Sequence, residues 1–359
     1  MAARVSIVVR SMGRPELHDA LASLAAQTWP DVEVVVVAAS GPGHPAPPPT
    51  CGPHSIRFVP GDAPRLRPVA ANAGLDVATG AFVGLLDDDD LYLPTHIETL
   101  VAALHAAPTC PAAHAIVREV DAGGRAVQVH AQPFSRLLLY RDSYIPMNSV
   151  LFRRTALAQC RFDERLEICE DWDFWLQLAE LGDFAFVPAE TAVYRSSLGM
   201  SGTRSGVKRN EEQCRRYTAL IATKWERRAR EVAGAVAAAA AQALDLFTKG
   251  HRVEAEAAAD RVLASYPYEL AALNLKGTLL ALRGDIEGAL ARFRLASTGV
   301  PSDVPSRFNL AQALERSGRA GEAISEYDRI LALEPLHPHA AARRSTLERQ
   351  RNGTPGTPL

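Results

Sequence analysis

Four consecutive carboxylates, Asp87 to Asp90, are the densest group of chemically active side chains in the sequence. They follow the apolar run 81–86, which predicts a buried strand, and Pro94 beyond them favours the start of a helix. An open α/β sheet places its ligands at such a strand end. Adjacent carboxylates repel one another, so a compact domain needs a cation or a ring of donors to compensate them, and oxygen-rich sites suit Mg²⁺ or Mn²⁺. The alternative is a solvated acidic turn.

A second pair of carboxylates, Glu170 and Asp171, opens the segment 170–178. The spacing of its apolar residues, Trp172 and Trp175 among them, predicts an amphipathic helix with both carboxylates in the first turn. Carboxylates in that position gain about 0.3–1 kcal/mol from the helix dipole. A purely structural role is therefore the alternative for this pair.

Strands and helices alternate over the first hundred residues. Short β-branched runs predict strands at 5–9, 32–37 and 56–59, a helix is expected after Pro15, and the Gly- and Pro-rich segment 40–53 is interpreted as a surface loop. The alternation predicts a parallel sheet with right-handed crossovers, an architecture that binds nucleotides but does not by itself name a chemistry. Further strands are expected within 112–129 and at 149–152.

Taken in order, these features resemble the family 2 glycosyltransferases of the GT-A fold, over roughly residues 4–205. The resemblance rests on several ordered motifs rather than on any one of them. They are the strand VSIVV with an Arg-Pro-Glu-Leu helix start, the Ala71-Asn72-Ala73-Gly74 turn, Leu86 with Asp87 to Asp90, Phe162-Asp163-Glu164, the segment from Glu170 to Leu176, and Tyr194-Arg195. The resemblance implies an α/β, Rossmann-like nucleotide-diphospho-sugar transferase domain. It also implies transfer with inversion of configuration at the anomeric carbon and the use of Mn²⁺ or Mg²⁺.

The same resemblance implies roles for individual residues. Asp87, Asp88 and Asp89 correspond to the DXD motif, in which Asp88 lies near the ribose, Asp89 is the most direct metal ligand and Asp87 supports it. Asp171 falls on the position of the catalytic base, and Glu170 either binds acceptor hydroxyls or caps the helix. The residues expected to bind the nucleotide-sugar are Arg10, Ser11, Arg67, Asn72, Asp87 and Asp88.

Three departures from the family pattern leave the donor open. Ala38 and Ala39 stand where these enzymes usually carry an acidic pair that holds the nucleotide base. The arginine expected before Asn72 is absent, although Arg65 and Arg67 lie a few residues upstream and could approach a diphosphate. Ser197 replaces a histidine that follows Tyr-Arg in the family, so a metal ligand from this loop is uncertain.

Two segments follow the transferase motifs. Residues 196–203 are small and Gly-rich, which fits either a closing lid or an ordinary connection. A long helix is expected from Lys208, with basic residues such as Arg215 and Arg216. Its charge suits anionic lipid headgroups and a lipid-linked acceptor, but its weak apolar face favours a solvated helix that packs on its neighbours.

The last third of the chain repeats with a period of 34 residues. The glycines Gly250, Gly284 and Gly318 share this spacing, and three further sets of residues share it too. They are Ala255, Ala289 and Ala323; Ala259, Phe293 and Tyr327; and Pro267, Pro301 and Pro335. The period and the order of residue types resemble tetratricopeptide (TPR) repeats, three helical hairpins that form an all-α solenoid. Its groove suits a peptide or protein partner, although a structural cap or a dimer surface is the alternative.

The composition sets limits on partners and location. A chain of 359 residues with 47% hydrophobic residues can form two or three domains, and a net charge of −2 argues against a nucleic-acid partner. Five scattered cysteines and the lack of a signal peptide or a strongly apolar 20-residue stretch predict a cytoplasmic protein with at most peripheral membrane contact. The expected divisions are 1–205 (transferase), 206–235 (basic connecting helix), 236–345 (three repeats) and 346–359 (disordered tail).

Two hypotheses follow for function. The first is a metal-dependent inverting glycosyltransferase that moves a sugar from a nucleotide-sugar to a glycan, lipid-linked or protein acceptor, with the repeats recruiting the acceptor or a partner. The second is a catalytically silent nucleotide-sugar-binding domain on a repeat scaffold. The complete set of Asp87, Asp88, Asp89 and Asp171 favours the enzyme, because a silent domain would not need to keep it.

Overall fold

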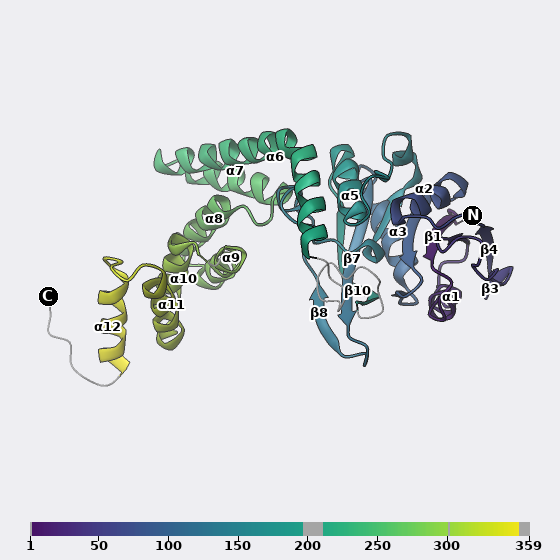
Figure 1. Cartoon of the computed structure of the whole chain (residues 1–359). Coiled ribbons are helices and arrows are strands. Elements are labelled where there is room, and N and C mark those ends of the chain that lie inside the picture. The colour runs from purple at the N-terminus through teal and green to yellow at the C-terminus, as the bar shows by residue number, and fades with distance from the viewer. Residues whose placement is uncertain (1, 197–210, 301, 352–359) are drawn as a thin grey trace. The chain divides into compact units, whose positions relative to one another are not determined.

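The computed structural model describes residues 2–196, 211–300 and 302–351. The chain divides into two compact units, Met1–Arg227 and Arg228–Leu359. The first unit is a mixed α/β domain and the second is helical, as the sequence predicts (Figure 1). The glycine-rich loop and the start of the basic helix, residues 197–210, lie outside the described residues, as does the tail 352–359.

One sheet organises the described part of the first unit. Its strand order is β3-β4-β2-β1-β5-β9-β7-β10-β6, and β8 pairs with β7. The strands are β1 (Val5–Ser11), β2 (Val32–Ala38), β3 (Thr50–Cys51), β4 (His54–Val59), β5 (Phe82–Asp87), β6 (Leu91–Tyr92), β7 (Ala112–Val120), β8 (Ala126–His130), β9 (Val150–Arg153) and β10 (Ala185–Arg195).

The sheet is mixed: β7 and β10 run parallel to each other, and β3 runs antiparallel to β4. β4, β2, β1 and β5 run parallel, which confirms the expectation from the first hundred residues. β9 then runs antiparallel to β5 and β7, and β6 runs antiparallel to β10. The apolar patterns from residue 112 onward indicate strands but not whether these strands run parallel or antiparallel to their neighbours. The antiparallel pairing was therefore not predictable from them.

Helices cover both faces of the sheet. Alternate residues of β1, including Val5, Ile7 and Val9, share a core cluster with α1 (Leu17–Ala25) and α3 (His96–Ala106). The opposite face packs against α2 (Arg67–Val77) and α5 (Glu170–Leu181), whose Phe174 makes an edge contact with Phe152 of β9. Burial of these apolar stripes is the main force that holds the layers together.

The stretch Ala71 to Gly74 differs from the expected turn, because it lies inside α2. A Cβ atom at Gly74 would stand 2.2 Å from Val8 Cγ1 and 3.0 Å from Val37 Cγ2. No real Cβ atom approaches a neighbour at such a distance. Gly74 is therefore needed for the close approach of α2 to the sheet and not for a turn.

The remaining helices of the first unit are short, except for α6. They are α4 (Arg136–Leu139) and the 3₁₀ turns η1 (Met147–Ser149) and η2 (Arg154–Ala158). α6 (Glu211–Thr248) begins in the first unit and ends in the second. Among the described helices, it is the one that is long and apolar enough to cross a membrane by length and composition, with a window of mean hydropathy 1.2. A single helix of this kind is a weak indication of a membrane span.

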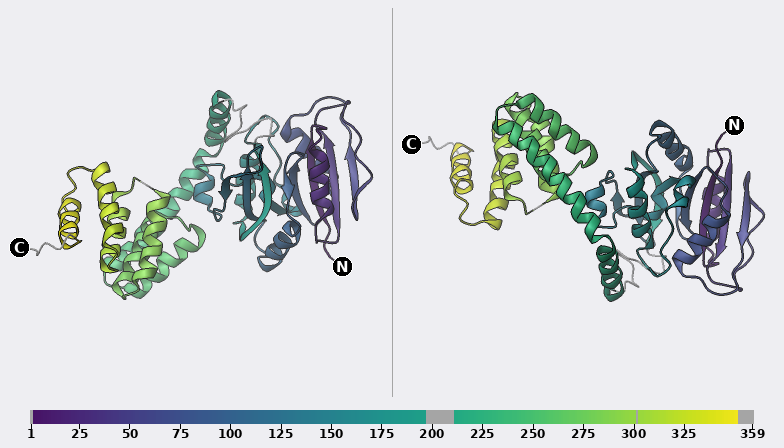
Figure 2. Two further views of the ribbon diagram at one scale, coloured as in Figure 1. Left: turned by 90° about the horizontal axis from the view of Figure 1, so that it is seen from below. Right: turned by 90° about the horizontal axis from the view of Figure 1, so that it is seen from above.

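The second unit consists of helical hairpins that follow the 34-residue period (Figure 2). After α6 come α7 (Arg252–Ser265), α8 (Leu270–Leu282), α9 (Ile286–Gly299), α10 (Val304–Arg316), α11 (Ala320–Leu333) and α12 (Ala340–Arg351). Gly250, Gly284 and Gly318 have φ angles of 87°, 87° and 76°, which a glycine adopts without strain. Each glycine sits in the turn before the second helix of a pair, as the TPR pattern predicts.

Small and aromatic residues of the repeat alternate in the core of this unit. Ala255, Ala289 and Ala323 are fully buried and allow close approach of the paired helices. Phe293 and Tyr327, which occupy one register of the period, are 3% and 0% exposed. The residues that define the repeat are therefore those that fill its core.

Candidate active site

The site begins where two parallel strands end side by side. β1 and β5 pair in a register that sets Arg10 opposite Asp87. Arg10 Nε and Nη2 donate to the two carboxylate oxygens of Asp87 at 2.8 and 3.0 Å, and Nη1 donates to Glu170 Oε1 at 2.5 Å. Burial disfavours the charge of Arg10, but the two carboxylates outweigh it and raise its pKa above the ordinary value. Arg10 thus joins the strand ends to the first turn of α5.

Asp88 points into the protein and fixes the turn after β1. Its Oδ2 accepts hydrogen bonds from Ser11 Oγ at 3.0 Å and from Met12 N at 2.7 Å. Its Oδ1 accepts from Arg14 Nε at 3.1 Å and from Arg14 Nη2. With no exposed surface and both oxygens bonded, Asp88 holds the turn in place.

Asp89 and Asp90 complete the acidic run. Asp89 Oδ2 lies 3.2 Å from Arg14 Nη2, yet burial and then the charge of Asp87 raise the pKa of Asp89 to about 6. Asp90 accepts a hydrogen bond from Arg195 N at 3.0 Å, and burial and Asp89 raise its pKa. Asp88, Asp89 and Asp90 are all at most 5% exposed, so the alternative of a solvated acidic turn is wrong.

The second acidic pair lies in the first turn of α5, as predicted. Cys169, which precedes it, has a φ angle of 59°, and among the described residues it is the one non-glycine residue with a positive φ. Asp171 Oδ1 accepts a hydrogen bond from Trp172 N at 2.8 Å. Burial and then the charge of Glu170 raise the pKa of Asp171 to about 6. Glu170 itself is buried and forms an ion pair with Arg10. This contact gives Glu170 a structural role that does not depend on a bound substrate.

These groups line one cavity of about 100 Å³. Arg67 contributes a guanidinium, which together with Arg10 lowers the pKa of Asp87 against the effect of burial. The opposite wall is the segment 143–148, which Trp175 Nε1 holds by donating to Ile145 O at 3.2 Å. Asn148 Nδ2 donates to Val193 O at 3.2 Å, which leaves its buried Oδ1 without a partner among the described residues. The cavity therefore combines anionic, cationic and neutral polar groups.

Six predicted site residues line this cavity: Arg10, Arg67, Asp87, Asp89, Glu170 and Asp171. Three others do not line it. Ser11 is buried between Asp88 and His44, and Asp88 is buried as described. Asn72 donates to Phe162 O and Glu164 Oε1, both at 3.0 Å, and accepts from Phe162 N at 3.1 Å. The amide of Asn72 thus holds a loop, and its binding of nucleotide-sugar stays a prediction.

The sequence of residues 6–157 matches the model of the glycosyl transferase family 2. The matched segment lies within the first unit and defines a domain similar to the family 2 glycosyltransferases. Its matched residues include both strand ends and the complete acidic run, and they stop short of Glu170 and Asp171 in α5.

Two curated relatives are similar to this chain, and one of them is named as a glycosyltransferase. The chain is similar to the uncharacterized glycosyltransferase YwdF of Bacillus subtilis (strain 168), with 27% identity over 213 residues, 54% of this chain and 75% of that protein. The uncharacterized protein y4gI of Sinorhizobium fredii is 30% identical over 112 residues, 31% of this chain and 12% of that protein. Among solved structures, S. aureus TarS 1–349 has a TM-score of 0.44 and 16% identity, over 98% of this chain and 92% of that chain.

The carboxylates of the glycosyltransferase domain fit a divalent cation by their chemistry. Asp87 and Asp89 both reach the cavity and offer hard oxygen ligands. Burial and then the charge of Asp87 raise the pKa of Asp89 despite the neighbouring Arg14, and a bound cation would oppose this rise. No cluster of three or more acidic, His or Cys ligands occurs among the described residues.

Several residues of the site were not predicted. Arg14 binds both Asp88 and Asp89, and its position just after β1 was the available signal. The buried His130 also lines the cavity, with Nε2 3.1 Å from Glu119 Oε2. The wall 143–148 carries no motif, and only its tertiary contacts bring it to the site.

Proposed function

We propose that this domain transfers a sugar from a nucleoside-diphosphate sugar to a hydroxyl group of an acceptor, with inversion at the anomeric carbon. The main support is that Asp171 lines the same cavity as Asp87, Asp89 and Arg67. A base, two oxygen ligands and a cation for phosphate thus meet in one place. This combination is what attack on a sugar and departure of a diphosphate require.

Asp171 is the proposed general base. It takes the proton of the acceptor hydroxyl as the hydroxyl oxygen attacks the sugar from the face opposite the diphosphate. A pKa of about 6 suits this role, because the carboxylate is mostly ionised at neutral pH yet more basic than an ordinary Asp. Glu170, neutralised by Arg10, keeps the turn in place beside it.

The leaving diphosphate needs positive charge. Arg67 supplies it directly, and Asp87 and Asp89 would hold Mn²⁺ or Mg²⁺, which stabilises charge on phosphate oxygens when bound. Asn148 Oδ1 is placed to accept a hydrogen bond from a substrate hydroxyl at the cavity wall. We infer a nucleotide-sugar donor, a glycan, lipid-linked or protein acceptor, and recruitment of the acceptor or a partner by the repeats, in the cytoplasm.

The test is a thermal-shift panel of nucleoside diphosphates and nucleotide-sugars, with and without Mn²⁺, on the native chain, Asp89→Ala and Asp171→Asn. We expect one nucleotide class to stabilise the native chain with Mn²⁺, to lose this effect in Asp89→Ala and to keep it in Asp171→Asn. Donor hydrolysis or transfer is then measured for that class.

Two results would change the proposal. Metal-dependent binding without any turnover would support the silent nucleotide-sugar binder. No metal-dependent binding in a folded sample would count against the donor site itself. In that case partner capture with residues 236–345 becomes the next experiment.

A further inference from the structure

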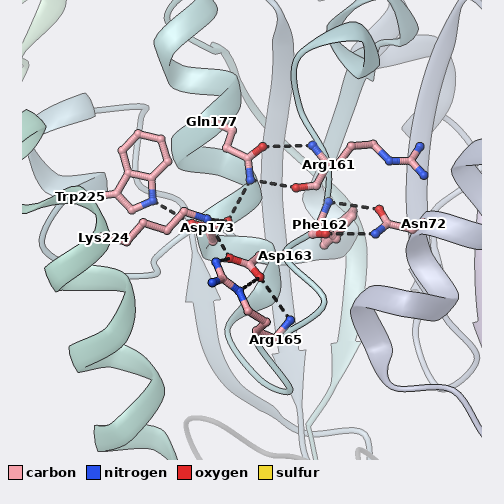
Figure 3. Close-up of polar contacts among 9 residues, drawn as sticks. All are labelled: Asn72, Arg161, Phe162, Asp163, Arg165, Asp173, Gln177, Lys224 and Trp225. Atoms are coloured by element: carbon pink, nitrogen blue, oxygen red, sulfur yellow. Dashed lines mark hydrogen bonds and ion pairs between the residues drawn. The ribbon is translucent and has the colours of Figure 1, made fainter.

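A buried carboxylate two residues after Asp171 ties α5 to α6 (Figure 3). The side chain of Asp173 has no exposed surface. It accepts hydrogen bonds from Trp225 Nε1 at 2.8 Å and from Lys224 Nζ and Gln177 Nε2, both at 2.9 Å. Two of its three donors therefore come from a helix about 50 residues further along the chain, within the first unit.

The same two helices hold the loop 161–165 between them. Lys224 Nζ also lies 3.1 Å from Asp163 Oδ2, and Arg165 pairs with that carboxylate at 2.7 Å. Gln177 Oε1 of α5 accepts a hydrogen bond from Arg161 N at 3.0 Å, and Gln177 Nε2 donates to Arg161 O at 2.8 Å. A single network thus connects α6, the loop and α5.

The network extends to the helix that carries Arg67. Asn72 of α2 clasps the backbone of Phe162 on the other side of the loop, as Figure 3 shows. Helix α2 begins at Arg67, and α5 begins at Glu170 and Asp171. Contacts of Lys224 and Trp225 therefore connect to both helices that present groups to the cavity.

The first turn of α5 depends on such side-chain contacts because its backbone is weakly held. Cys169 adopts a left-handed conformation that costs energy for a residue with a side chain. The first backbone hydrogen bond of the helix, from Asp173 N to Cys169 O, is long at 3.4 Å. Removing a donor from the buried Asp173 would leave its charge poorly compensated, and the turn would open to relieve it.

We propose that Lys224 and Trp225 of α6 are positioning residues for the first turn of α5, and through it for Asp171. Both lie outside the segment 6–157 that matches the family, in the part of α6 that belongs to the first unit. The role of Asp171 in this statement rests on the proposed function. The contact itself is independent of that function and can be tested without substrate.

The first measurement is amide hydrogen exchange of residues 169–175 in the full chain, for Trp225→Phe and Lys224→Met. Trp225→Phe removes one N–H and keeps a ring against Tyr140, whose centroid lies 6.2 Å away. Loss of a hydrogen bond to a buried charge is expected to speed exchange of this turn about tenfold or more. Trp29→Phe is the matched control, because its indole donates to Ala3 O at 2.9 Å elsewhere in the unit.

The second measurement compares kcat and KM with the donor that the thermal-shift panel identifies. We expect Trp225→Phe and Lys224→Met to lower kcat about tenfold and leave KM for the donor nearly unchanged. Lys276→Met, which removes a lysine bound to two carboxylates in the second unit, should change neither quantity. A purely structural contact would instead lower the amount of folded protein and leave kcat per folded molecule intact.

The two measurements separate the possible failures. Unchanged exchange in both variants, with circular dichroism like that of the native chain, overturns the positioning role. Faster exchange in a protein that turns over no donor would support the positioning of the turn by Lys224 and Trp225. The same result would contradict the proposed function. If Trp225→Phe fails to fold, Lys224→Met tests the same carboxylate from the other donor.

Discussion

The cavity of the candidate site has more deeply buried ion pairs than the repeat unit, whose most buried pair among the described residues, Arg307 and Glu326, is 13% and 10% exposed. Around the cavity, Arg10 and Glu170 form an ion pair in which the side chains are 5% and 3% exposed. In the repeat unit, Arg283 and Glu256 form a pair of similar length with side chains 56% and 21% exposed. Buried charges are costly to desolvate and strongly coupled, whereas exposed pairs contribute little. The first unit therefore gives up stability at one place to hold a reactive arrangement.

Backbone strain follows the same division. The repeat unit places its positive φ angles on glycines, at each turn of the period. The cavity places one on Cys169, next to Glu170 and Asp171. Local rules suffice for the repeats, while the cavity depends on contacts that enforce an unfavourable conformation.

The largest effect is expected from Asp171→Asn. Loss of a general base lowers the turnover rate by about 10²–10⁴-fold, measured with the donor identified above. The same change should stabilise the first unit by about 1–2 kcal/mol at pH 7, because the raised pKa means that the ionised carboxylate destabilises the fold. Asp76→Asn is the control, since Asp76 is 61% exposed and pairs only with Arg161 among the described residues. A variant that loses stability together with activity would contradict this account.

The next effect compares Arg10→Met with Arg283→Met. Arg10→Met removes the partner of the buried Glu170 and of the partly buried Asp87, and should cost about 3–5 kcal/mol of unfolding free energy. Arg283→Met should cost at most about 1 kcal/mol. All four tryptophans lie before residue 228, so their fluorescence reports on the first unit, and the circular dichroism of the helices follows both. Equal costs at the two sites would remove the contrast between the units.

A smaller effect is expected in the pH dependence of the native enzyme. Turnover should fall about tenfold per pH unit below about pH 6, as Asp171 becomes protonated. The stability contribution of this carboxyl has the opposite sign. The ionised carboxylate of Asp171 destabilises the fold fully above about pH 6. This destabilisation disappears as the pH falls toward 3.8, the ordinary pKa of the group. A rate that stays constant down to pH 5 would exclude Asp171 as the base.

The smallest effect separates two glycines outside the cavity. Gly284→Ala should lower stability by about 1 kcal/mol, since its φ of 87° disfavours a side chain although no atom lies within 4 Å of the new Cβ. Gly234→Ala lies inside α6, also in open space, and should raise stability by up to about 1 kcal/mol. Thermal unfolding followed at 222 nm checks both, and opposite signs are the critical result.

The sequence made the strands, the repeats and the acidic groups predictable because each depends on local pattern. Asp87 comes directly after an apolar run, so its place at a strand end follows from neighbours in sequence. Gly250, Gly284 and Gly318 reveal the hairpins through their common spacing. The convergence of Asp87 and Asp171 on one cavity came from the family resemblance and not from any local signal.

Long-range contacts account for what was not predicted. The ion pairs of Arg14 depend on how the turn after β1 meets the acidic run. Asn72 reaches a loop about 90 residues away, so its contacts do not follow from its place in a motif. The direction of β9 and the wall 143–148 likewise depend on how distant segments pack.

The continuity of α6 limits how this chain can be divided or recombined. A gene fusion that joined a foreign transferase to these repeats at residues 206–210 would discard no repeat, yet it would leave Lys224 and Trp225 facing a surface that lacks Asp173. A shortened transferase that ended at residue 205 would lose the same two donors. The natural seam for exchanging cassettes therefore lies after Arg227, in the middle of a helix, where ordinary practice would not cut.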